Sequence, residues 1–97
     1  MIYEWDEAKR AANLKKHGFD FADADLVLEN EYVLIVDSSR KGEARQQALA
    51  YVFDVLAVLS VVFVPGEERF RILSFRLAKR IERRAYHEWL ENDFDDA

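Results

Sequence analysis

The run ALAYVFDVLAVLSVVFV, residues 48–64, is the longest nearly uncharged stretch of the chain and decides how the middle of the fold is built. Asp54 is its one charged residue, and the rest is rich in the β-branched and aromatic residues that favour strands. We predict two buried strands, over residues 45–53 and 55–64, with a reversal near Asp54 that lacks the Gly or Asn of a two-residue hairpin. A membrane span is the weaker alternative, because the run is short for a bilayer and Asp54 lies near its middle.

Two more strands flank this pair. Residues 32–36 are an apolar segment, and residues 69–76 follow a turn at residues 65–68 that contains the only Pro of the chain. Because short turns join all four strands, they are predicted to form an antiparallel meander.

The N-terminal third predicts helices after a short strand at residues 2–5. Asp6 can cap a helix over residues 7–16, which Gly18 ends in the left-handed conformation, and Asp20 can cap a second helix. Ala8, Ala11, Ala12 and Leu14 are expected to supply the apolar stripe of the first helix, and Phe21, Ala24 and Leu28 that of the second, which covers residues 21–30.

The C-terminal part predicts one further helix, over residues 78–90, with Ile81, Ala85 and Trp89 spaced by four residues. We therefore expect an α+β fold in which an antiparallel sheet is packed on one face by two N-terminal helices and one C-terminal helix. Residues 1–90 are the predicted single domain, and residues 91–97 an acidic, frayed tail.

The composition narrows the functional classes. The 97 residues include no Cys, which excludes disulfides and thiolate metal sites. Acidic residues at positions 4, 6 and 7 interrupt any signal-peptide pattern, so a cytoplasmic location is expected. Neither a phosphate-binding glycine loop nor a zinc-protease or serine-triad pattern is present, and no metal or cofactor is expected.

A basic strip, RFRILSFRLAKRIERR at residues 69–84, stands out against this background. It carries a local charge of +6 in a chain of net charge −5. Such a concentration of Lys and Arg favours an anionic partner, and phosphate is the first candidate.

The strand part of the strip presents three arginines. Arg69 and Arg71 share one face of a regular strand, whereas Arg76 points to the other face unless the strand-end geometry turns it back. Arginines among apolar residues are costly when unpaired, so Arg71 and Arg76 either serve a site or form a salt bridge with Glu43 or Asp37.

Other candidates lie around this strand. Lys79, Arg80, Arg83 and Arg84 open the last helix, where the dipole disfavours cations, so they either bind a partner or form a solvated basic face. Glu43 and Arg45 follow the polar loop, and they are either a general base with a phosphate clamp or an ordinary ion pair. The simplest role of His17 is as a cation at a helix C-terminus.

The chain resembles the BrnT family of ribonuclease toxins from type II toxin–antitoxin modules. The resemblance spans residues 2–89 and is most specific in the opening EWDEAKRAANLKKHGFDFADA, residues 4–24. Later elements are Asp37, the Gly42–Glu43–x–Arg45 element, and RILSFRLA at residues 71–78, followed by Glu82, Arg83 and Tyr86. Lys79 stands where the family often has Thr, which removes a good N-cap.

The resemblance implies a RelE-like fold, RNA cleavage and inhibition of translation. It also implies a cognate, BrnA-like antitoxin that neutralises the toxin and through which the complex binds operator DNA.

RNA cleaves itself when its 2′-OH is aligned with the neighbouring phosphate, so arginines that position the strand and neutralise charge suffice without a metal. The catalytic candidates are Arg71 and Arg76 on the phosphate, Arg45 assisting and Glu43 as the base. Candidates for RNA or antitoxin binding are Arg69, Lys79, Arg80, Arg83, Tyr86 and His17, with Lys79, Arg80 and Tyr86 also candidate acids. The alternatives are a non-catalytic, toxin-like binding protein or co-repressor, and a plain RNA-binding module.

Overall fold

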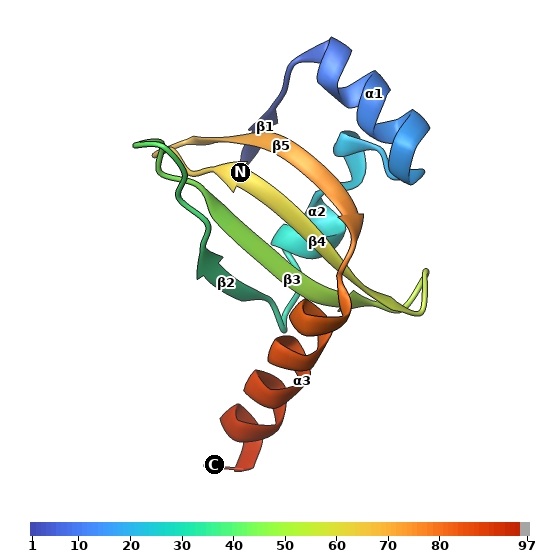
Figure 1. Cartoon of the computed structure of the whole chain (residues 1–97), viewed down its shortest axis with the longest axis vertical. Helices are drawn as coiled ribbons and strands as arrows, with labels where there is room; N and C mark the ends of the chain where they lie inside the picture. The colour runs from blue at the N-terminus through green and yellow to red at the C-terminus, as the bar shows by residue number, and fades with distance from the viewer. Residues whose placement is uncertain (96–97) are drawn as a thin grey trace.

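A computed structural model describes residues 1–95 of the chain and shows a mixed sheet with helices on both sides (Figure 1). The elements follow in the order β1 (Ile2–Glu4), α1 (Glu7–His17), the 3-10 turn η1 (Phe21–Asp23), α2 (Asp25–Leu28), β2 (Leu34–Asp37), β3 (Gln46–Val52), β4 (Ala57–Val64), β5 (Arg69–Leu77) and α3 (Arg80–Asp95). The predicted α+β class is confirmed.

The sheet has five strands in the order β1-β5-β4-β3-β2. Strands β2 to β5 form the predicted antiparallel meander. Strand β1 pairs with the start of β5 in parallel, Ile2 opposite Arg69 and Glu4 opposite Arg71. The prediction of an antiparallel sheet is therefore wrong at this edge. The helices and the other three strands lie between β1 and β5 in the chain, so no tight turn forces these two strands to be antiparallel.

The apolar run at residues 48–64 forms the two buried strands predicted for it, β3 and β4. A short loop joins them, and in it Leu56 adopts a left-handed φ of 58°. Gly and Asn adopt this conformation more readily, so a Leu at this position gives no sequence signal for the turn. No helix in residues 1–95 is long and apolar enough to cross a membrane.

Helix α1 begins and ends as its caps predict. The Asp6 side chain accepts from the backbone N–H of Lys9, and Gly18 takes a φ of 79° after the last turn. The predicted apolar stripe is wrong, because its four residues are exposed and Asn13 is the buried residue of the helix. A polar side chain rather than an apolar face therefore fixes α1 against the sheet.

The second predicted helix is split. Asp20 caps the η1 turn through Ala22 N–H, as expected, and a single turn of α-helix follows as α2. Phe21 of η1, Ala24 and Val27 of α2 are fully buried against the sheet.

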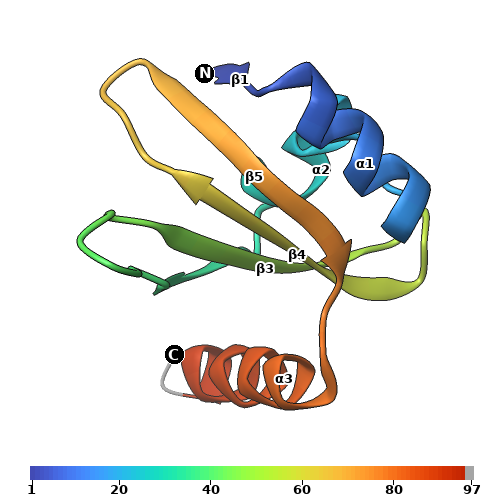
Figure 2. The same ribbon diagram turned by 45° about the horizontal axis from the view of Figure 1, so that its top comes forward.

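The two faces of the sheet are covered by different helices (Figure 2). One face packs against η1 and α2 and contains the main core, with alternate β3 residues Ala48, Ala50 and Val52. The intervening residue Leu49 points to the other face and packs with Ala78 and Tyr86 of the α3 region. The prediction that all helices cover one face is wrong, because β3 is apolar on both of its faces and needs cover on each.

Helix α3 presents a different side to the sheet from the one predicted. Ile81 is 78 % exposed and Ala85 is exposed, whereas Tyr86, Trp89 and Leu90 pack toward the sheet. The helix also continues through Asp95, beyond the predicted end at residue 90, so its last turns fall in the predicted tail. Residues 96–97 of that tail lie outside the described residues.

Candidate functional site

An irregularity in β5 places its arginines on one face. Arg71 lies opposite Val64 and Arg76 opposite Ser60, but the register shifts between Val62 and Phe63, so that the pairing skips Leu73. Residues five apart point to opposite faces of a regular strand, and one skipped residue brings them back to the same face. The expectation for a regular strand is therefore wrong for Arg76, which shares the α3 face of the sheet with Arg71.

The loop before β3 adds more cations to that face. Arg40 and Glu43 form an isolated antiparallel bridge around Lys41 and Gly42, which have φ angles of 46° and 81°. Two consecutive positive φ angles are characteristic of a two-residue hairpin turn. This turn extends the β2–β3 hairpin beyond its paired strands, and Arg40 lines the same cavity as Arg45.

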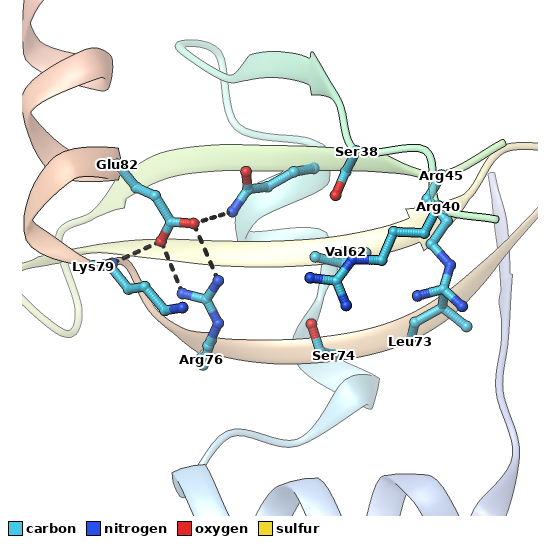
Figure 3. Close-up of a pocket in the computed structure, with 10 residues that line it drawn as sticks. Ser38, Arg40, Arg45, Val62, Leu73, Ser74, Arg76, Lys79 and Glu82 are labelled. Carbon is cyan, nitrogen blue, oxygen red and sulfur yellow. Dashed lines mark hydrogen bonds and ion pairs between the residues drawn. The ribbon is translucent and has the colours of Figure 1, made fainter. Parts of the chain in front are cut away.

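These elements enclose a cavity of about 340 Å³ between the sheet, the hairpin loop and the start of α3 (Figure 3). Its lining has a formal charge of +3, with one acid and otherwise cationic, hydroxyl, amide or apolar side chains. The lining residues are Ser38, Arg40, Arg45, Gln47, Val62, Leu73, Ser74, Arg76, Lys79 and Glu82.

Arg76 is held by a two-pronged ion pair. Its Nη1 and Nη2 donate to the two carboxylate oxygens of Glu82 at 2.8 and 3.1 Å, and Nη1 also donates to the Leu77 carbonyl. Both side chains are largely enclosed, 20 % exposed for Arg76 and 16 % for Glu82. The guanidinium plane of Arg76 is therefore fixed at the edge of the cavity, on a different partner from the Glu43 or Asp37 predicted.

Glu82 also joins the helix to the sheet. Its Oε1 accepts from the backbone N–H of Lys79 at 2.7 Å, which caps α3 from the third helical position, and its Oε2 accepts from the Gln47 amide at 2.6 Å. Burial alone would raise the pKa of Glu82, but the hydrogen bonds from Arg76, Lys79 and Gln47 outweigh it and lower the pKa to about 2. Glu82 is therefore ionised at neutral pH, and its oxygens accept four hydrogen bonds.

Glu43 makes a second, more open arrangement. Its Oε1 accepts from Arg45 at 2.6 Å and its Oε2 from Arg71 at 3.0 Å, with 39 % of the side chain exposed. The hydrogen bond from Arg45 is the main reason why the pKa of Glu43 is lowered, and the charge of Arg71 adds to it. The predicted ion pair between Glu43 and Arg45 is present, and it extends to Arg71.

Of the predicted residues, only Arg45, Arg76 and Lys79 line the cavity; Glu43 and Arg71 are not among its lining residues, and neither are the remaining ones. Arg69 is paired with Glu4 at 3.6 Å, Arg80 is exposed beside Ile81, and Arg83 donates to the Ala78 carbonyl. His17 is half-buried at the end of α1, and burial, followed by the charges of Lys16 and Arg76, lowers its pKa. This places His17 within electrostatic reach of Arg76, and the lowered pKa disfavours the cationic role first expected for it.

Tyr86 belongs to the core. It is 1 % exposed, and its hydroxyl donates to the Tyr32 carbonyl at 2.7 Å. A side chain enclosed in this way presents no surface to RNA or to an antitoxin, so the structure gives Tyr86 the role of anchoring α3 to the sheet.

Sequence reasoning missed five of the eight polar residues that line the cavity. Ser38, Arg40, Gln47, Ser74 and Glu82 were not candidates, although all five line it. Glu82 had a detectable signal, because a Glu three residues after the residue that precedes a helix is the acidic half of a capping box. Ser74 had no such signal, because its side chain points to the cavity only as a result of the irregularity at Leu73.

Within residues 1–95 there is no group of three or more His, Cys, Asp or Glu side chains that could hold a metal ion. The positive charge of the site comes from its own Arg and Lys side chains.

The fold and site together define a small α+β protein with an arginine-rich cavity on one face of its sheet. The family model described as ribonuclease toxin, BrnT, of type II toxin–antitoxin system matches residues 5–82, and the chain belongs to this family. The match includes the whole cavity lining. No individual curated protein matches the chain. Membership identifies the chain with a family of ribonuclease toxins and implies an antitoxin partner.

Proposed function

We propose that this protein is a metal-independent endoribonuclease whose reaction takes place in the arginine-lined cavity. The observation that carries the proposal is the convergence of Arg40, Arg45, Arg76 and Lys79 on one cavity in a chain whose net charge is −5. An RNA phosphate supplies the negative charge that this cavity lacks, and several guanidinium groups can bind its oxygens with defined geometry.

The reaction consistent with this site is transfer of the phosphate within the RNA strand. The 2′-oxygen attacks the adjacent phosphorus, the bond from phosphorus to the 5′-oxygen breaks, and the products are a 2′,3′-cyclic phosphate and a 5′-hydroxyl. Arg76 and Arg45 neutralise the charge that develops on the phosphorane oxygens. Lys79 lines the cavity and is the candidate that gives a proton to the departing 5′-oxygen.

Glu43 is the candidate acceptor for the proton of the 2′-hydroxyl. In the free protein its ion pairs with Arg45 and Arg71 make it a weak base. A phosphate that draws these arginines away leaves the carboxylate without partners, which raises its pKa toward the ordinary value. Glu82 is not suited to this role, because four donors already occupy its oxygens.

The biological consequences belong to the same proposal. RNA cleavage inhibits translation in the cytoplasm, a cognate antitoxin neutralises the toxin, and the complex reaches operator DNA through the antitoxin. The placement of helices on both sides of a meander also supports assignment to the RelE-like superfamily.

The test is cleavage of a fluorescent single-stranded RNA by the purified protein in the presence of a chelator. The wild-type protein is expected to cut it and leave a cyclic phosphate. Arg76→Lys keeps a cation beside Glu82 but loses the planar guanidinium with its paired donors. This variant is expected to cut on the order of 100-fold more slowly. Lys15→Ala, which removes an exposed cation of α1 outside the cavity, serves as the control and is expected to cut at the wild-type rate. Equal rates for the wild-type protein and Arg76→Lys would refute the assignment.

A second candidate function is a toxin-like binding protein that acts through its antitoxin complex. The observation in its favour is Ile81, which is 78 % exposed between the cationic Arg80 and Arg84 on α3. An apolar residue set among cations suits an acidic protein segment better than it suits RNA. Tight antitoxin binding by a protein that neither cuts RNA nor arrests growth would favour this alternative.

A further inference from the structure

Strand β5 has an uncovered edge beside the candidate site. Its outer neighbour, β1, pairs with residues 69–71, and no strand formed by residues 1–95 continues along that edge past the skipped residue Leu73. Ser74 and Arg76, the two polar β5 residues that line the cavity, lie in this part of the strand. An unpaired edge strand is free to fray or to shift its register.

Asn13 takes the place of the missing strand at one residue. Its Nδ2 donates to the Phe75 carbonyl at 2.8 Å, and its Oδ1 accepts from the Phe75 N–H at 3.1 Å. The same Nδ2 donates to the Phe19 carbonyl at 3.0 Å, and the side chain is 8 % exposed. One amide side chain thus makes both hydrogen bonds that a residue of a neighbouring strand would make.

These bonds select one register of β5. The Phe75 N–H and C=O point away from β4 toward Asn13, so the backbone groups of Ser74 and Arg76 are those directed at β4. A shift of β5 by one residue would turn the Phe75 groups toward β4 and move the Arg76 side chain to the opposite face. Asn13 can make its two bonds only in the register that keeps Arg76 above the cavity.

We propose that Asn13 is a positioning residue for the candidate site: it locks the register of β5 beyond the skipped residue and so holds Arg76 on the same face as Arg45. The inference rests on the proposed function only in treating that cavity as the place where RNA is cut. Its structural content, the register of β5, stands independently of catalysis. Asn13 is not the only side chain that holds α1 in place, because Arg10 of the same helix also binds Asp20 at 2.7 Å.

The experiment compares Asn13→Ala with Val27→Ala. Val27 is the fully buried residue of α2, a helix that packs chiefly on β3 and β4, and its truncation lowers stability without removing a hydrogen bond of β5. Two readouts are taken for each protein: the nuclear Overhauser contacts between Arg76 and Ser60, which are opposite each other in the observed register, and the kcat and KM for RNA cleavage.

For Asn13→Ala we expect the contacts between Arg76 and Ser60 to weaken or disappear and kcat to fall on the order of 100-fold, since a small displacement of a catalytic group is sufficient for such a loss. Val27→Ala is expected to keep the contacts and a kcat near that of the wild-type protein. Asn13→Ala with intact contacts and the kcat of Val27→Ala would overturn the proposal.

A second variant covers the case in which Asn13→Ala does not fold. Asn13→Asp keeps the shape and the bond from Phe75 N–H, but it loses both donated bonds and places a carboxylate against the Phe75 and Phe19 carbonyls. The same loss of the contacts between Arg76 and Ser60 is expected, and their full retention would overturn the proposal. If the wild-type protein cuts no RNA, the proposed function fails, whereas the contacts still test the role of Asn13.

Discussion

Two carboxylates hold the arginines of the site, and they do so differently. Glu82 lies on α3, is 16 % exposed and accepts hydrogen bonds from Arg76, Gln47 and the backbone at the helix start. Glu43 lies next to the hairpin turn, is 39 % exposed and binds Arg45 and Arg71 with one oxygen each. Glu82 is part of the framework that joins helix to sheet, whereas Glu43 belongs to an open loop.

The comparison separates a fixed part of the site from an adjustable part. Arg76 cannot leave Glu82 without exposing an enclosed carboxylate, which is costly. Arg45 and Arg71 can leave Glu43 at little cost, because water replaces them at an exposed group. We infer that RNA binds to a preset Arg76 and recruits the arginines of the hairpin side.

The largest effect is expected for Glu82→Ala. It removes the partner of Arg76 and the cap of α3 together, so the free energy of unfolding is expected to fall by on the order of 3 kcal/mol in urea denaturation. Glu88→Ala, at an exposed position of the same helix, is the matched control and is expected to change it little. Equal stability of the two variants would show that Glu82 is not part of the framework.

The pH dependence of stability comes next. The pKa of Glu82 is about 2 in the folded chain, against an ordinary value of 4.5 in the unfolded chain. A lowered pKa stabilises the fold fully above the unfolded value, and this stabilisation, on the order of 2 kcal/mol, is lost as the pH falls from about 5 to about 2.

Urea denaturation of the wild-type protein and Glu82→Gln across this range checks the prediction. The difference in unfolding free energy between them is expected to shrink as the pH falls. A difference that stays constant would mean that the Glu82 carboxylate does not carry the interaction.

A smaller effect on stability is expected for Glu43→Gln, which weakens only exposed ion pairs. The thermal midpoint should change much less than for Glu82→Ala, whereas RNA cleavage should fall on the order of 100-fold, because the candidate base is lost. Cleavage at the wild-type rate would remove Glu43 from the mechanism and leave it as an ion-pair partner.

The smallest effect is expected for Lys41→Asn in the hairpin turn. Lys41 has a φ of 46°, which Asn adopts more readily, so the unfolding free energy should rise by about 0.5 kcal/mol. Cleavage should not change, because Lys41 is not among the residues that line the cavity. A loss of stability would show that Lys41 makes a favourable contact in the turn.

The sequence predicted the elements whose signals are local. The cap at Asp6, the left-handed Gly18 and the strands on either side of Asp54 depend on neighbouring residues, and all are observed. The exposed side of α3 was mispredicted because the helix has two possible apolar faces. Ile81 belongs to one spacing of four residues, and Tyr86 and Leu90 belong to another.

The site was less predictable because its geometry depends on long-range pairing. The face of Arg76 is set by a residue skipped in β5 opposite β4, and no local pattern marks Leu73 as that residue. Asn13 looked like one polar residue in a helix that was expected to bury alanines. Its bonds reach Phe75, 62 positions away in the chain.

In the proposed mechanism Arg45 and Arg76 act on the same phosphate, and a double-mutant cycle tests this most directly. Rates of RNA cleavage are measured for the wild-type protein, Arg45→Lys, Arg76→Lys and the variant that carries both changes. Groups that act as a unit are strongly non-additive, so the combined loss in log kcat should be clearly smaller than the sum of the two single losses. Losses that simply add would contradict the claim and place the two arginines at independent sites.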